Sequence, residues 1–115
     1  MLEAPAGLAE SGRALWESIT GVFGLELYEQ QLLLQACRSV DLLDRLAEKA
    51  AVSGLTVVNA KGDEVTAPWI TEHRQQSQNY SRMIASLRLP EGESDERPQR
   101  RGAARRSYGI RGSVA

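Results

Sequence analysis

The C-terminal segment of the chain is a cluster of arginines on an otherwise acidic protein. Because residues 97–115 hold six of the fourteen basic residues and none of the fifteen acidic ones, residues 1–96 carry a formal charge of −7. A guanidinium group binds a phosphate through two hydrogen bonds. The segment therefore predicts contacts with a polyanion, nucleic acid first, that add affinity with little sequence selectivity. The arginines are Arg97, Arg100, Arg101, Arg105, Arg106 and Arg111.

Two simpler interpretations of this segment stay open. It can be a disordered, solubilising tail, or it can pair within the chain with the acidic residues of 91–96. The use of arginine without lysine favours the phosphate-binding interpretation. Arg74, Arg82 and Arg88 are second candidates for contacts with DNA, although their spacings of eight and six residues do not form one regular helical stripe.

No residue pattern indicates catalysis. His73 is the only histidine and Cys37 the only cysteine, and no motif pairs them. We expect a half-buried, hydrogen-bonded histidine and a small buried cysteine. The carboxylates at 41, 44 and 48 lie among arginines at helical spacing and predict a solvated, salt-bridged helix face. We therefore predict a protein that is not an enzyme and that binds neither a metal ion nor a cofactor.

The elements that carry these residues are mainly helical. Apolar periodicity predicts three helices over about 8–23, 26–53 and 68–89. The first contains Gly12, which costs about 1 kcal/mol relative to alanine. Gly54 suits the end of the second helix and Pro68 the first turn of the third. A turn-rich break between short apolar runs predicts a β-hairpin over about 55–66, which must pack on something because a lone hairpin is marginal.

The chain divides into three parts. We expect a flexible N-terminus over 1–7, a helical core and oligomerisation domain over 8–90, and an acidic linker with the arginine-rich, disordered tail over 91–115. Small chains bury a small share of their surface, which favours oligomers. Three leucines on the polar face of the second helix are either stray exposed residues or an intersubunit seam. They are Leu27, Leu34 and Leu42.

The cellular location is expected to be cytoplasmic. No stretch approaches the ~20 apolar residues that span a membrane. The first residues lack the basic and apolar regions of a signal peptide.

With these features in order, the chain resembles the small subunit of phage terminase, in the branch common in long-tailed phages of actinobacteria. The resemblance begins with Gly-x-x-Leu-Trp at residues 12–16 and continues with a leucine-rich helix over 28–46 that contains Ala-Cys-Arg. A hairpin over 57–65, Ala-Pro opening a helix with His73-Arg74, and the Leu-x-Leu-Pro stop at 87–90 follow. An acidic linker and an Ala/Arg tail complete it, although Tyr108 stands where the family often has tryptophan.

The resemblance implies a DNA-packaging function in the cytoplasm of the host. Such subunits form ring-shaped homo-oligomers and bind double-stranded viral DNA at the packaging start. They also recruit and regulate the large terminase subunit, which supplies the ATPase and nuclease. The alternative hypothesis is a helical protein–protein adaptor that does not bind DNA and whose tail contacts an acidic partner.

Overall fold

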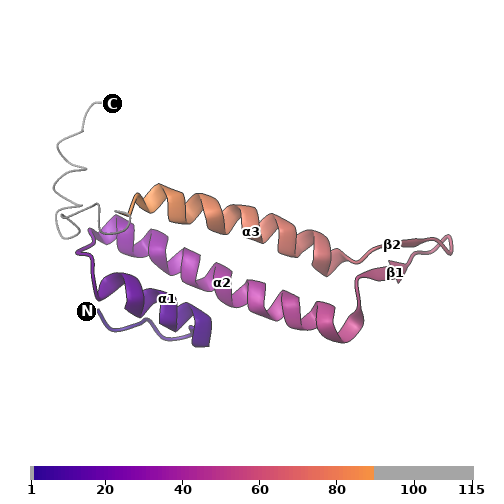
Figure 1. Ribbon diagram of the computed structural model, residues 1–115, viewed down its shortest axis with the longest axis horizontal. Coiled ribbons are helices and arrows are strands. Elements are labelled where there is room, and N and C mark those ends of the chain that lie inside the picture. The colour runs from indigo at the N-terminus through magenta and orange to yellow at the C-terminus, as the bar shows by residue number, and fades with distance from the viewer. Residues whose placement is uncertain (1, 90–115) are drawn as a thin grey trace, which may run out of the picture.

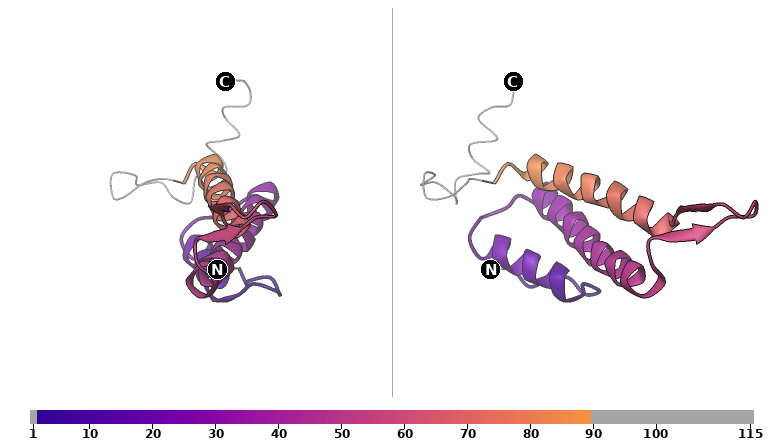
Figure 2. Two further views of the ribbon diagram at one scale, coloured as in Figure 1. Left: turned by 90° about the vertical axis from the view of Figure 1, so that its right-hand side faces the viewer. Right: turned by 45° about the vertical axis from the view of Figure 1, so that its right-hand side comes forward.

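The computed structural model contains three α-helices and one two-stranded antiparallel hairpin, which confirms the predicted fold class (Figure 1). It describes residues 2–89, so the arginine tail predicted to be disordered lies outside the described residues. The order is α1 (Glu10–Thr20), α2 (Leu27–Ser53), β1 (Thr56–Val58), β2 (Glu64–Thr66) and α3 (Pro68–Leu87). Helix α2 lies between α1 and α3 and contacts both (Figures 1 and 2).

Helix α1 is shorter at both ends than the predicted range of 8–23. Leu8 is buried before the helix begins, and the chain turns after Thr20. The N-terminal segment, expected to be flexible, returns along α1, where the Trp16 indole N–H donates a hydrogen bond of 3.1 Å to the carbonyl oxygen of Leu2. This bond holds the segment against the helix that follows it.

Helix α2 is long because its 27 residues contain neither glycine nor proline, and it spans about 40 Å. A capping box closes its start: the Glu26 side chain accepts from the backbone of the first turn, and Glu29 Oε1 accepts from the Glu26 N–H at 2.9 Å. Gly54 ends the helix with a φ of 87°, a conformation that glycine adopts without a steric penalty.

The hydrophobic core occupies one end of the molecule. Six buried residues from all three helices and the N-terminal segment form it: Leu8, Trp16, Ile19, Leu33, Cys37 and Leu87. Toward the C-terminus of α2 the exposure rises, because only α3 accompanies this half of the helix (Figure 1). The described residues therefore pack as three helices at one end and as two helices with a hairpin at the other.

The hairpin projects beyond the helices at this second end (Figure 1). Val57 pairs with Val65, and the ladder is flanked by a 2.9 Å bond from the Ala67 N–H to the Leu55 carbonyl. At the tip, Asn59 Oδ1 accepts two backbone N–H bonds of 2.9 Å each and stabilises a turn of the Asx type. The tip is thus ordered by its own hydrogen bonds.

Trp69 joins the base of the hairpin to the helices. Its indole N–H donates a 2.8 Å bond to the Gly54 carbonyl, and the Lys49 ammonium lies 4.8 Å from the centre of its ring. The elements that pack closely are α2 with α3, α1 with α2, and β1 with β2. The expectation that the hairpin packs on another element is not met within the described chain beyond this base.

The resulting molecule is elongated, with extents of 58 × 31 × 26 Å. Its radius of gyration is 18.1 Å, whereas a compact domain of this size has about 12–13 Å. An elongated chain with a core at one end leaves apolar surface exposed at the other. The exposed large side chains there include Val52, Leu55 and Val58, which are 86%, 66% and 71% exposed.

Candidate nucleic-acid interface

The outer face of α3 gathers arginine and amide side chains. The exposed residues of this helix recur every three to four positions, away from α2. They include Arg74, Gln75, Gln78, Ser81 and Arg82. Arg74 and Arg82 lie on this face about 80° apart around the helix axis and about 12 Å apart along it. The helix thus brings together two of the three arginines whose spacing alone did not define a stripe.

Arg88 follows directly after the helix. It is the C-terminal cap of α3 and adopts a left-handed conformation with a φ of 54°. Its side chain is exposed, and its backbone N–H donates a 3.1 Å bond to the Ala85 carbonyl. We define the outer face of α3 as the five residues Arg74, Gln75, Gln78, Ser81 and Arg82.

Electrostatics distinguish this face from the rest of the described residues. Helix α3 carries one carboxylate, Glu72, against Arg74 and Arg82, and no Asp or Glu occurs from residue 73 to residue 89, whereas α1 and α2 each carry more carboxylates than basic side chains. Arginine, glutamine and serine are the side chains that contact phosphate oxygens in protein–DNA complexes. An anion that approaches α3 along this face therefore meets less electrostatic repulsion than along the other two helices.

The other predicted DNA-binding residues belong to the tail. Arg97, Arg100, Arg101, Arg105, Arg106 and Arg111 all lie outside the described residues. The last described residue, Leu89, follows Arg88 at the end of α3. In the sequence, the tail thus follows α3 after residues 90–96.

The three leucines proposed as an intersubunit seam occupy different environments. Leu27 is 68% exposed at the start of α2. Leu34 is half-buried and packs against the core of its own chain, and Leu42 lines a groove between α2 and α3. Since α2 is contacted on two sides, residues on its nominally polar face also find partners within the chain.

Asp41 and Asp44 do not form the salt-bridged face expected from their spacing. Asp41 accepts backbone N–H bonds from Ala9 at 2.7 Å and from Gly12 at 2.6 Å, and Asp44 accepts a hydrogen bond from the Ser11 hydroxyl. These donors belong to the first turn of α1, whose cap residue has no capping side chain of its own. The Asp41 carboxylate of α2 therefore caps α1, and both carboxylates suit the positive end of the α1 dipole.

Cys37 and His73 take the environments expected from the sequence. Cys37 is fully buried, and burial, with a smaller effect of the nearby Asp41 carboxylate, raises the pKa of its thiol to about 11. A neutral buried thiol is a poor nucleophile. His73 is half-buried, and its Nδ1 lies 3.5 Å from the Ser77 hydroxyl.

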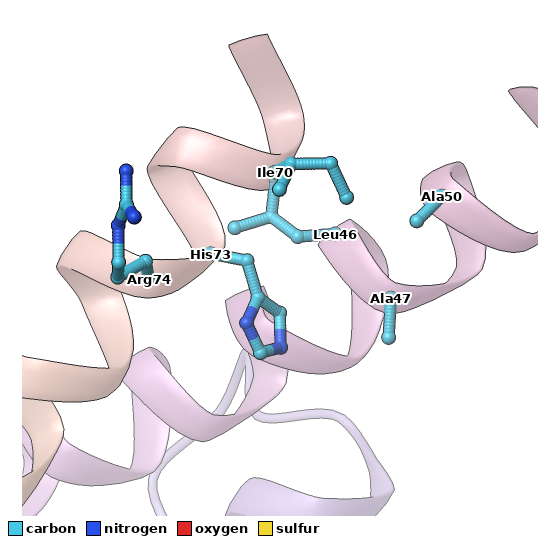
Figure 3. A pocket seen from close by; sticks show the side chains of 6 residues that line it. All are labelled: Leu46, Ala47, Ala50, Ile70, His73 and Arg74. Atoms are coloured by element: carbon cyan, nitrogen blue, oxygen red, sulfur yellow. The ribbon is translucent and has the colours of Figure 1, made fainter. Parts of the chain in front are cut away.

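Two grooves run between α2 and α3. The first, of about 380 Å³, is apolar and lies near the hairpin; Arg74 points away from it (Figure 3). Its lining residues are Leu46, Ala47, Ala50, Ile70, His73 and Arg74. The second, of about 390 Å³, is more polar and is crossed by a 3.3 Å hydrogen bond from the Ser39 hydroxyl to Gln76 Oε1.

Within residues 2–89, His, Cys, Asp and Glu side chains form no group of three that could hold a metal ion. In the same range, each helix is too short or too polar to cross a membrane.

Comparison of the chain with protein-family models, with curated proteins and with solved structures found no match.

Proposed function

We propose that this protein is the small subunit of a viral DNA-packaging terminase, acting in the host cytoplasm as a ring-shaped homo-oligomer. In this role it binds double-stranded viral DNA at the packaging start and recruits the large subunit, which supplies ATP hydrolysis and DNA cleavage. The protein itself performs no catalysis.

The observation that supports DNA binding is the distribution of charge along α3 and the chain that follows it. The outer face of α3 has no carboxylate, and beyond the acidic residues of 91–96 the chain contains the six arginines of the tail within a protein of net charge −1. Since phosphate contacts dominate affinity for DNA, this segregation of charge supports DNA binding along the outer face of α3 and by the tail. Copies in a ring would add their weak contacts.

The assembly half is supported by shape and exposure. A 58 Å body with its core at one end leaves aliphatic side chains in water at the other, and burial of such surface is the main driving force of association. The same surface favours the alternative function, an adaptor that binds only proteins. The two functions differ in DNA affinity and not in assembly.

Binding of fluorescent duplex DNA between about 50 and 200 mM salt tests the proposal. We expect the logarithm of the association constant to fall linearly with the logarithm of salt concentration. Deletion of residues 97–115 should lower the slope by up to about 5 per subunit, because up to six phosphate contacts are lost. A duplex from the packaging start should bind more tightly than a scrambled duplex of the same length.

Two outcomes would count against this function. Absence of salt-dependent affinity for either duplex would leave the adaptor as the better proposal. Normal DNA binding without co-purification of the large subunit would remove the recruiting role while leaving the DNA-binding role intact.

A further inference from the structure

The hairpin has two chemically different faces. Side chains alternate along a strand, and Val57 pairs with Val65, so these two side chains share one face with Leu55. The opposite face carries Thr56, Val58, Glu64 and Thr66, and there the Thr56 hydroxyl donates a 2.6 Å bond to Glu64 Oε2. We call the side formed by Leu55, Val57 and Val65 the apolar face of the hairpin.

Two of the three side chains of the apolar face are exposed, and Val57 is half-buried. Leu55 is 66% and Val65 38% exposed, and neither belongs to the core cluster. A hairpin of two three-residue strands is marginal in water unless its apolar face is covered. The hydrogen bonds at the tip and the bond from Trp69 hold the apolar face of the hairpin, which we also call the ridge, in place at the end of the molecule.

A complementary surface lies on the same molecule. The apolar groove of about 380 Å³ between α2 and α3 is lined by Leu46, Ala47, Ala50 and Ile70, and the small side chains of the two alanines leave room for an incoming aliphatic group (Figure 3). Charge also matches. The hairpin carries Asp63 and Glu64 against a single Lys61, and Arg74 lies at the edge of the groove.

We propose that the apolar face of the hairpin of one subunit packs into the α2–α3 groove of a second copy of this chain. The ridge and the groove are different surfaces, so the contact is heterologous. Each subunit then offers one ridge and one groove, and repetition of the contact generates a ring when its rotation closes. The inference rests on the proposed assembly and names the two surfaces that would form it.

Complementation of two variants tests this contact. Val65→Glu places a charge on the ridge, and Ala47→Glu blocks the groove and repels the acidic hairpin tip. Each variant alone should associate at least tenfold more weakly than the wild type in sedimentation velocity. Mixed together they should form a 1:1 dimer and nothing larger, because Val65→Glu retains its groove and Ala47→Glu retains its ridge.

Matched controls carry the same substitution elsewhere. Val58→Glu lies on the opposite face of the same hairpin, and Ala14→Glu lies on the exposed side of α1. Both should assemble as the wild type does. Circular dichroism and thermal unfolding verify that each variant is folded. Val65→Thr, which keeps the side-chain shape, should weaken association by an intermediate factor and replaces Val65→Glu if that variant unfolds.

Three results would overturn the inference. These are wild-type assembly by either variant alone, a mixture of the two variants that stays monomeric, and a wild-type chain that is monomeric at all concentrations. Wild-type assembly by Ala47→Glu together with loss of assembly in Val65→Glu would indicate contact between two hairpins instead. If the protein assembles through the ridge and the groove but does not bind DNA, the proposed function alone is refuted. If it binds DNA and its assembly is unchanged by Val65→Glu and by Ala47→Glu, this contact alone is refuted.

Discussion

The backbone N–H of Gly12 on α1 donates a 2.6 Å hydrogen bond to Oδ1 of Asp41 on α2. The two helices approach so closely here that a Cβ atom on Gly12 would lie 2.8 Å from the Cys37 carbonyl oxygen and 2.9 Å from Asp41 Cγ. Gly12 lowers the helix propensity of α1, but because it has no Cβ it allows the start of α1 to reach the capping carboxylate of Asp41. The contact joins the first turn of α1 to the middle of the longest helix.

Gly12→Ala should destabilise the protein despite alanine's higher helix propensity. Overpacking against a backbone carbonyl costs about 1–3 kcal/mol and exceeds the gain of about 1 kcal/mol in propensity. Urea unfolding measures the difference. Gly24→Ala is the matched control, since nothing lies within 4 Å of its Cβ position. Equal stability of Gly12→Ala and the wild type would contradict the close approach.

Asp41→Ala should lower the free energy of unfolding by about 1–2 kcal/mol, because two backbone N–H groups at the start of α1 lose their acceptor. Asp41→Asn keeps one acceptor oxygen and should lose about half as much. Glu48→Ala, exposed on the same helix, serves as the control in the same urea titration. If all three variants unfold alike, the capping role is refuted.

Stability should fall at high pH because of Cys37. Burial raises the pKa of its thiol from 9.0 to about 11, so the unfolded chain releases the proton first as the pH rises. The free energy of unfolding should be independent of this group below pH 9 and should fall by up to about 3 kcal/mol between pH 9 and 11. Burial also raises the pKa of Tyr80, which adds to the fall above pH 10.

Unfolding in urea from pH 7 to 11 measures this effect. In Cys37→Ala only the contribution of Tyr80 should remain, so the curve should be flatter than that of the wild type. The same steep fall in both proteins would show that the thiol is not responsible. In the native wild type at pH 7, the thiol should resist alkylation until the chain unfolds.

The double substitution Arg74→Gln with Arg82→Gln should weaken duplex DNA binding by about tenfold at low salt and reduce the salt slope by about 2 per subunit. Arg13→Gln with Arg45→Gln removes the same charge from exposed positions of α1 and α2. If that pair weakens binding equally, the effect arises from net charge and not from the outer face of α3.

Local patterns were sufficient to predict the helices. The apolar periodicity of α2, Gly54 at its end and Pro68 at the start of α3 act within a few residues, and their predicted boundaries lie within two residues of the observed ones. The ends of α1 were less predictable, because the packing of Leu8 and of the returning N-terminal segment limits that helix. For the candidate nucleic-acid interface, the sequence predicted which arginines could take part but not the exposed face on which two of them lie.

By itself, the sequence determined the type and order of the elements and the segregation of arginine toward the C-terminus, since periodicity and charge are properties of neighbouring residues. Only the tertiary structure decided that Asp41 caps α1 and that Gly12 must lack a Cβ, because both depend on the distance between residues 29 positions apart. Tertiary structure also placed Arg74 and Arg82 on one exposed face and left the hairpin uncovered. Burial and exposure follow from which helices lie side by side, and no local pattern contains that information.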